Sequence, residues 1–208
     1  NTTFIKVLET MSKDALRIIA KNKKTKNKTL DLGNCGLTEL PAEILDCWWL
    51  EALVLCNTWA EYDVVEQEWK IQTSKNKGKA NNITFLLSNH TNLPYLKKLF
   101  INQNQITDLS SFAGLTQLEI FWCYSNRITD LSPIANFTDL QQLNCFDNQI
   151  TDLSSLARLN NLQEIICSVN LIADLSPIAN LTNLKQLFCQ NNRITDLSLI
   201  ESLINLQT

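Results

Sequence analysis

Residues 115–136 read L-T-Q-L-E-I-F-W-C-Y-S-N-R-I-T-D-L-S-P-I-A-N, and this pattern occupies five consecutive units of 22 residues. The units begin at Leu93, Leu115, Phe137, Leu159 and Leu181. Leucine, isoleucine or phenylalanine stands at the first, fourth, seventh, fourteenth, seventeenth and twentieth places of each unit, and asparagine stands at the twelfth. A fixed period of this length predicts a solenoid in which each unit forms one coil.

The seventh to tenth places of each unit alternate in the manner of a half-buried strand. In the second unit, Phe121 and Cys123 are predicted to point inward, and Trp122 and Tyr124 outward. One such strand cannot bury its apolar face alone, so the strands should stack about 4.8 Å apart in a parallel sheet. On the return leg, Ser132-Pro133 reads as an N-cap and a first helical proline, which predicts short 3₁₀ turns on the convex side.

Two further columns of polar residues repeat with the same period. The asparagines are expected to satisfy turn backbone that no strand ladder reaches; they are Asn104, Asn126, Asn148, Asn170 and Asn192. The aspartates are predicted to cap the convex turns, with a cation ladder as the alternative; they are Asp108, Asp130, Asp152, Asp174 and Asp196.

The L-x-x-L-x-L-x-x-N-x-I core of residues 93–202 resembles the 22-residue leucine-rich repeats of bacterial internalins. The resemblance implies an α/β solenoid, wound as a right-handed superhelix. Its parallel sheet would be concave, and its convex side would be 3₁₀ or irregular. This resemblance indicates the fold more specifically than it indicates the binding partner, because one type of solenoid binds many different partners.

The N-terminal region, residues 1–28, is predicted to form an amphipathic capping helix from about residue 3 to residue 22, followed by a Lys-rich connector. Apolar residues recur at helical spacing from Phe4 to Ile19. The helix would cover the open edge of the first strand. Residues 1–28 carry eight basic side chains against Glu9 and Asp14, a balance of +6 that leaves −9 on the rest of the chain. We interpret the lysines as a solvated helix end and predict no nucleic-acid partner.

Residues 29–92 are predicted to form two divergent repeats with an insertion at about residues 58–80. The first repeat contains L-D-L-G-N-C-G-L-T-E-L-P, and Asn81 resumes the regular pattern after the insertion. Within the insertion, Trp59, Tyr62, Val65 and Trp69 follow helical spacing. The insertion should form a lateral wall beside the concave sheet. Trp59, Tyr62 and Trp69 are either a secondary binding wall or the contacts that pack the insertion onto its neighbouring repeat.

The amphipathic helix followed by L-D-L-G-N-C-G-L-T-E-L-P also resembles the start of leucine-rich repeat regions in bacterial Roco proteins. Those proteins are multidomain GTPases with a Ras-like domain downstream. This second resemblance implies that the chain is the regulatory repeat region of a larger GTPase or other signalling enzyme.

The sequence contains no pattern that indicates catalysis. It lacks the phosphate-cradling, dinucleotide-binding and zinc-protease motifs, and its single histidine, His90, is expected at the surface. We therefore predict a protein that is not an enzyme and uses no cofactor and no metal. No apolar run approaches the roughly 18 residues that a membrane span needs.

Cysteines form a column at the ninth place of four consecutive units: Cys123, Cys145, Cys167 and Cys189. They are predicted to be small, buried and free, because neighbouring in-register strands place such side chains poorly for disulfides. Free thiols in this number favour a reducing compartment and hence a cytoplasmic location. A secreted or surface-exposed location is the alternative.

The outward strand positions are the candidate partner-binding site. Apolar and aromatic residues there are not needed for the core and mark an interaction surface. The site comprises Phe100, Asn102, Trp122, Tyr124, Asn144, Phe146, Ile166, Ser168, Phe188 and Gln190. Lys98, Gln142, Glu164 and Gln186 would form a polar rim, which Arg127 and Arg193 extend. The predicted function is non-enzymatic binding of a protein or peptide on the concave face, with a surface adhesin as a further alternative.

Residues 203–208 begin a sixth repeat and stop before its strand. A bare strand edge would follow if the chain ended there. We therefore expect the native polypeptide to continue beyond residue 208.

Overall fold

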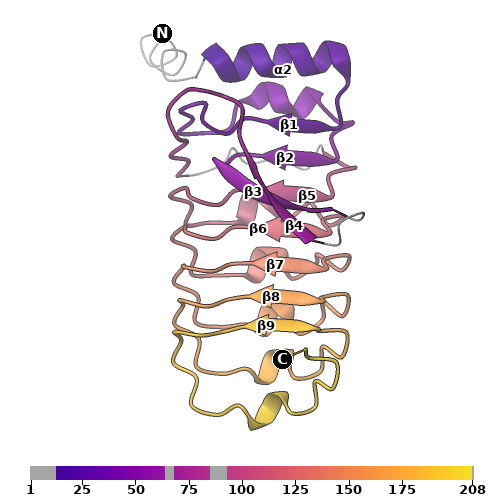
Figure 1. Cartoon of the computed structure of the whole chain (residues 1–208), viewed down its shortest axis with the longest axis vertical. Helices are drawn as coiled ribbons and strands as arrows, with labels where there is room; N and C mark the ends of the chain where they lie inside the picture. The colour runs from indigo at the N-terminus through magenta and orange to yellow at the C-terminus, as the bar shows by residue number, and fades with distance from the viewer. Residues whose placement is uncertain (1–12, 64–67, 85–92, 208) are drawn as a thin grey trace.

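The computed structural model describes residues 13–63, 68–84 and 93–207, apart from the side chains of residues 61–63, 68 and 69. Its main element is a parallel sheet of seven strands in the order β1-β2-β5-β6-β7-β8-β9 (Figure 1). The strands are β1 (Thr29–Asp31), β2 (Ala52–Val54), β5 (Lys98–Phe100), β6 (Ile120–Trp122), β7 (Gln142–Asn144), β8 (Glu164–Ile166) and β9 (Gln186–Phe188). Each regular unit supplies one strand, as the 22-residue period predicts.

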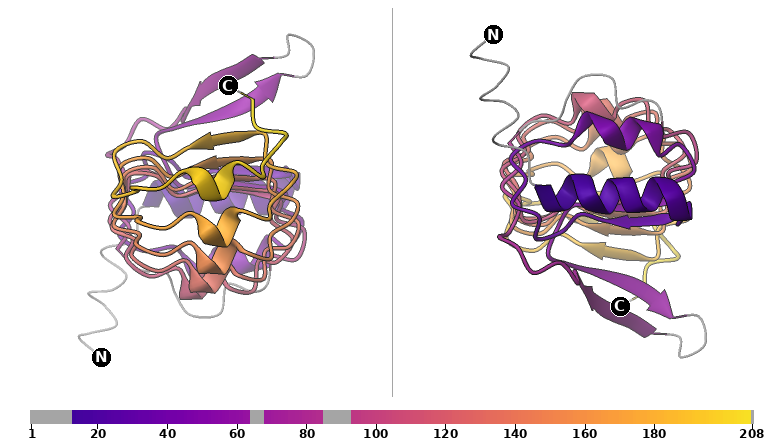
Figure 2. Two further views of the ribbon diagram at one scale, coloured as in Figure 1. Left: turned by 90° about the horizontal axis from the view of Figure 1, so that it is seen from below. Right: turned by 90° about the horizontal axis from the view of Figure 1, so that it is seen from above.

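Short 3₁₀ helices form the side of the solenoid opposite the sheet (Figure 2). They are η1 (Ala42–Asp46), η3 (Ser110–Phe112), η4 (Ser132–Ile134), η5 (Ser154–Leu156), η6 (Ser176–Ile178) and η7 (Ser198–Ile200). The predicted serine N-cap is wrong by one place, because Ser132 is the first residue of η4 and Leu131 is its N-cap. The aspartate two residues earlier performs the capping instead: the Ser132 N–H donates to Asp130 Oδ1 over 2.7 Å.

The aspartate column therefore caps the turns, as predicted. In the unit that follows η4, Asp152 Oδ1 accepts from both the N–H and the hydroxyl of Ser154, at 2.8 and 2.6 Å. These hydrogen bonds stabilise the carboxylate and hold the pKa of Asp152 below its usual value. The described residues contain no cluster of three side chains able to hold a metal ion.

A helix, α2 (Lys13–Thr25), covers the first strand at one end of the solenoid (Figure 1). It buries Ala15, Ile19 and Asn22 and ends three residues beyond the predicted limit. The predicted start, near residue 3, lies outside the described residues. The Asn22 side chain ties the helix to the second repeat, because its Oδ1 accepts a hydrogen bond of 3.0 Å from Trp49 Nε1.

The lysines after this helix make local contacts. Lys23 Nζ lies 2.5 Å from Asp46 Oδ2, and Lys28 Nζ lies 2.6 Å from Glu51 Oε1. Lys26 Nζ lies 3.3 Å from the centre of the Trp49 ring. Lysine side chains of this segment therefore make contacts within the fold.

The insertion forms an antiparallel hairpin of β3 (Thr58–Asp63) and β4 (Glu68–Thr73). The helical spacing found in the sequence is thus misleading for this segment. Its aromatic residues belong to two strands, and the backbone register pairs Tyr62 with Trp69. Val65 lies outside the described residues, as does His90 in the junction before the regular units.

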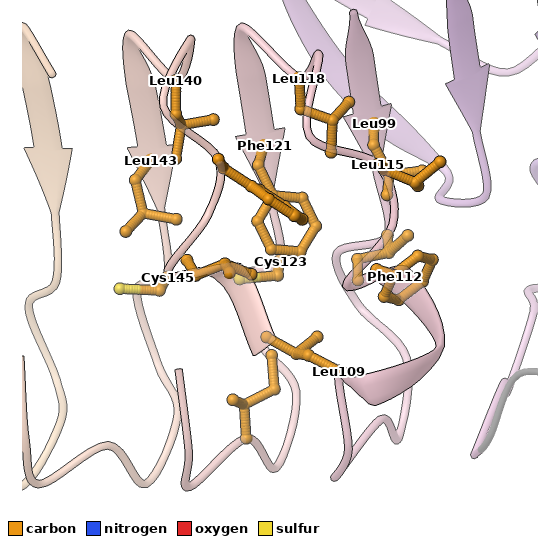
Figure 3. Packing of buried hydrophobic residues seen from close by; sticks show 14 of the residues in the cluster. Leu99, Leu109, Phe112, Leu115, Leu118, Phe121, Cys123, Leu140, Leu143 and Cys145 are labelled. Carbon is orange, nitrogen blue, oxygen red and sulfur yellow. The ribbon is translucent and has the colours of Figure 1, made fainter. Parts of the chain in front are cut away.

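The core runs the length of the solenoid between the sheet and the 3₁₀ helices, and Figure 3 shows part of it. Phe112, Phe121 and Phe137 contact one another through neighbouring units in tilted and edge-to-face arrangements, with ring centroids 6.2 and 6.1 Å apart. The predicted cysteine column is present: Cys123, Cys145 and Cys167 are buried and Cys189 is half-buried. All seven cysteines are free, and burial raises the pKa of the column thiols above their usual value.

The asparagine column links each coil to the preceding one. Asn148 Nδ2 donates to the carbonyl oxygens of Cys123 and Cys145, each at 3.1 Å, and its Oδ1 accepts from Ile128 N at 2.9 Å. Asn81 makes the equivalent bonds for the second repeat. Its Nδ2 donates to the carbonyls of Leu32 and Leu55 at 2.9 and 3.0 Å. The regular pattern therefore resumes at Asn81 after the insertion, as predicted.

Substitution of Asn148 by alanine should destabilise the whole solenoid. The change leaves the buried Ile128 N–H without a partner, at a cost of about 2 kcal/mol in the free energy of unfolding. The carbonyls of Cys123 and Cys145 each lose one hydrogen bond but keep another, from Asn126 and Asn170 respectively. Urea unfolding followed by circular dichroism measures this loss. The neighbouring exposed residue supplies the control, because Gln149→Ala should change stability by less than about 0.5 kcal/mol. Equal effects of the two substitutions would contradict this role of the asparagine.

The residue before each column asparagine has a left-handed backbone. The φ angles are 58° at Gln103, 51° at Ser125, 54° at Asp147, 58° at Val169 and 56° at Asn191. A β-branched residue adopts this conformation at a cost, whereas asparagine tolerates it. Val169 is therefore the most strained member of this column.

Replacement of Val169 by asparagine should stabilise the protein by about 1 kcal/mol, because the strain of the left-handed backbone is relieved. The midpoint of urea unfolding should rise. Asp147→Asn, at the same place one coil earlier, should leave that midpoint nearly unchanged. A Val169→Asn protein no more stable than the wild type would show that packing of the valine outweighs its backbone strain.

Candidate functional site on the concave sheet face

The outward face of the sheet, which we call the concave face, is built from the sixth, eighth and tenth places of the regular units. Strand alternation places these side chains away from the main core. Trp122, Tyr124, Phe146 and Ile166 are half-buried on this face. Asn144 is also half-buried, and Phe188 and Gln190 are exposed. Each coil from β6 to β9 therefore contributes at least one partly open apolar side chain to this face, and together these side chains form an apolar band.

The hairpin covers the other part of the concave face. It lies in front of β5 and β6 in Figure 1 and leans away from the sheet in Figure 2. Phe100 is 1% exposed and Asn102 is 0% exposed. Their predicted role as open binding residues is wrong, because Trp59 and the start of the hairpin cover them.

Trp59 and Phe100 are the centre of this covered part. Their ring centroids lie 6.4 Å apart, and the Phe100 ring meets Trp122 edge to face with centroids 5.5 Å apart. Val54 and Cys56 complete a small second core, against which Ile120 and Trp122 pack. Trp59 thus attaches the hairpin to the sheet. Trp122 has a structural role as well as a partly open surface.

Polar contacts hold the two ends of the hairpin. The Ser74 hydroxyl donates to the Asp31 carboxylate over 2.9 Å, and Asn76 Nδ2 donates to the carbonyl of Gly33 over 2.9 Å. At the other end, Asn102 Nδ2 donates to the carbonyl of Thr58 over 3.0 Å. The hairpin is therefore fixed to β1 and β5 and forms a defined border of the open face.

Tyr124 lies at this border. Burial beside the hairpin raises the pKa of its hydroxyl, and a hydrogen bond with Thr58 opposes that rise. The predicted wall residues Tyr62 and Trp69 belong to the hairpin strands, but their side chains lie outside the described part of the chain. Of the predicted wall, the structure places only Trp59, which packs against the neighbouring repeat.

Ser168 differs from its prediction as well. It is 6% exposed, and its hydroxyl donates to Gln190 Oε1 over 2.6 Å. This hydrogen bond joins the tenth places of two neighbouring coils. Ser168 is therefore part of the floor of the face and contributes little open surface.

The sixth-place residues lie along the margin of the apolar band. Gln142 and Glu164 are direct neighbours in the register of β7 and β8. Glu164 is half-buried, and burial raises the pKa of its carboxyl group. Arg127 and Arg193, predicted to extend this rim, are exposed at the turns beyond the strands.

The repeat family is identified by a family model for leucine-rich repeats in two copies. It matches residues 94–136, 116–158 and 138–180. The seven-stranded parallel sheet with one strand per coil agrees with this match. The protein is a leucine-rich repeat solenoid, similar in fold to internalins. No curated protein matches the chain at a significant level.

Solved internalin structures support the assignment. An internalin from Listeria monocytogenes, InlF, is 30% identical in sequence and superimposes with a TM-score of 0.72. The match covers 91% of this chain and 48% of the InlF chain. Internalin C2 from the same organism is 28% identical and has a TM-score of 0.64. This match covers 95% of this chain and 92% of the internalin C2 chain. This leucine-rich repeat protein thus spans about half the length of the InlF chain and nearly all of the internalin C2 chain.

A third Listeria monocytogenes structure also contains a repeated arrangement of cysteines, described as a cysteine ladder. The functional domain of InlJ, which includes a cysteine ladder, is 25% identical with a TM-score of 0.58, over 86% of this chain and 38% of its own. The comparisons do not show the predicted resemblance to Roco proteins. No helix in the described ranges is long and apolar enough to cross a membrane.

Substitution of Trp59 by alanine should detach the hairpin and open the second core. Removal of this buried ring should cost roughly 3 kcal/mol. Urea unfolding measures the loss, and limited proteolysis should show faster cleavage within residues 58–73. The control is Ile71→Ala on the paired strand, where the side chain is 80% exposed and its loss should have little effect. A hairpin that stays resistant to proteolysis in the Trp59→Ala protein would contradict this attachment.

Proposed function

We propose that this protein binds a protein or peptide partner on the part of the concave face that the hairpin leaves open. Leucine-rich repeat proteins are protein-interaction modules, and their fold is typically a non-enzymatic scaffold. The observation that carries the proposal is the apolar band of Phe146, Ile166 and Phe188, which the main core does not need. Aromatic and aliphatic side chains in such a patch supply most of the affinity of a typical interface.

The hairpin gives the proposed site one closed border. Its second core fixes Trp59, Phe100 and Trp122 through ring contacts. A partner segment would lie across β7, β8 and β9, with Tyr124 at the hairpin border. The site is therefore a prepared surface on rigid strands, which lowers the entropy cost of binding.

The residues best suited to test the proposal are Phe146 and Ile166. Trp122→Ala is a poor test because Trp122 also packs against the core beneath the hairpin. Phe146→Ala removes partly open surface two residues beyond β7, and Ile166→Ala removes it at the end of β8; neither residue belongs to that core. The probe is a library of random 12-residue peptides displayed on phage and selected against the immobilised wild-type protein.

The selected peptides should bind both variants about tenfold or more weakly, because each substitution removes an interface anchor. Fluorescence anisotropy with synthetic labelled peptides measures the dissociation constants. Ile204→Ala is the matched control, since Ile204 is 84% exposed and lies after the last 3₁₀ helix, away from the sheet face. Peptides that bind Phe146→Ala and Ile166→Ala as tightly as the wild type would contradict the proposed site.

The location and context of the protein remain separate predictions. The free cysteines motivate a cytoplasmic location, and similarity to internalins favours the secreted or surface-exposed alternative. The gene sequence upstream and downstream of residues 1–208 distinguishes these two locations. An upstream signal peptide and a cell-wall anchor would favour a surface adhesin. A downstream GTPase motif would favour a regulatory repeat region of a larger signalling enzyme.

A further inference from the structure

Glu164 is chemically distinct from its neighbours on the concave face. At the sixth, eighth and tenth places of the five regular units, all of them described, it is the one carboxylate. It is half-buried, and within the described part of the chain its carboxylate has no hydrogen-bond or ion-pair partner. A carboxylate that is partly removed from water and has no partner is energetically unfavourable. A cation that binds beside it therefore lowers the free energy of the site.

No cation of the described fold serves Glu164. Lys98 occupies the same place on β5, three strands away, which corresponds to about 14 Å at the usual strand spacing. That separation exceeds the Debye length of about 8 Å at physiological salt, so the interaction is largely screened. Lys185 is engaged at the edge of the sheet, where its Nζ donates to Gln163 Oε1 over 2.9 Å.

Gln142 adds a second unsatisfied acceptor beside Glu164. Its Oε1 is buried and has no donor in the described structure. The two residues are paired in the register of β7 and β8, so their backbones are about 4.8 Å apart. The last torsion of a glutamine side chain is broad, and the oxygen can therefore turn toward an entering donor.

An arginine side chain matches this pair of acceptors. Its guanidinium carries several N–H donors in a planar fork and can bond a carboxylate and an amide oxygen together. It is also less strongly hydrated than a lysine ammonium, which favours it at a half-buried site. Ile166 follows Glu164 by two places on the same face and supplies apolar surface beside the charge.

We propose that Glu164 and Gln142 form the recognition site for an arginine side chain of the partner, flanked by partner residues that are apolar. This inference rests on the proposed function, since it names the chemistry of a ligand bound on the concave face. The net charge of −9 on residues 29–208 supports it, because a basic partner segment is attracted to an acidic protein.

The test compares peptide selections on three proteins with the same phage library of random 12-residue peptides. Wild-type protein should enrich peptides with arginine at a fixed place between apolar residues. Glu164→Lys should instead enrich aspartate or glutamate at that place. Glu119→Lys is the matched charge reversal, because Glu119 pairs with Lys97 at the sheet edge, and it should select the same peptides as the wild type.

A direct measurement follows with one selected peptide and its citrulline analogue, which keeps the shape of arginine and removes its charge. The analogue should bind the wild type about tenfold more weakly, as expected for loss of a charge-assisted hydrogen bond. Against Glu164→Gln, the two peptides should bind with nearly equal affinity. Glu164→Gln preserves the size of the side chain, so this measurement still tests the proposal if the Glu164→Lys protein does not fold.

The possible results separate the two proposals. Peptides that require Phe146 but carry no arginine, or that bind equally well as citrulline analogues, would overturn the arginine site and leave the concave face as the binding surface. A lysine analogue that binds as tightly as the arginine peptide would also overturn it, because a single point charge would then suffice. Peptides that bind independently of Phe146 and Ile166 would overturn the proposed function itself.

Discussion

The asparagine column, whose members are buried or half-buried, is the constraint on which the structure depends. Each coil leaves the sheet through a turn whose backbone groups no strand ladder can pair, and one amide side chain satisfies them. Asn126 shows the geometry: Nδ2 donates to the carbonyls of Ile101 and Cys123 at 3.1 and 2.9 Å, and Oδ1 accepts from Ile106 N at 3.0 Å. Because these bonds connect neighbouring coils, they fix the register in which the strands stack. The outward residues of successive strands are consequently aligned into one face.

The regular part of the fold could be predicted from the sequence because its physical rules are local and repeated. Inward places must be apolar, turn places must supply hydrogen bonds, and a period of 22 residues leaves room for little else. The cysteine column and the aspartate caps follow from the same reasoning. The capping detail at Ser132 was missed because an aspartate two residues earlier can bond the same backbone N–H.

The insertion could not be predicted in this way. It occurs once, so no repetition distinguishes strand from helix, and its aromatic spacing suits a helix by coincidence. Strand alternation also indicates which face a residue occupies but not what covers that face. Phe100 and Asn102 were therefore expected to be open, although Trp59 and the hairpin bury them. Likewise, the lack of a partner for Glu164 depends on which lysines lie within reach, and this is known only from the strand order.

The central claim is that a partner binds the apolar face between the hairpin border and β9. The most direct measurement is photo-cross-linking with p-benzoylphenylalanine placed at position 146 or at position 204 and a selected peptide as the ligand. We expect an efficient cross-link from position 146 and none from position 204. Cross-linking from position 204 with none from position 146 would contradict it.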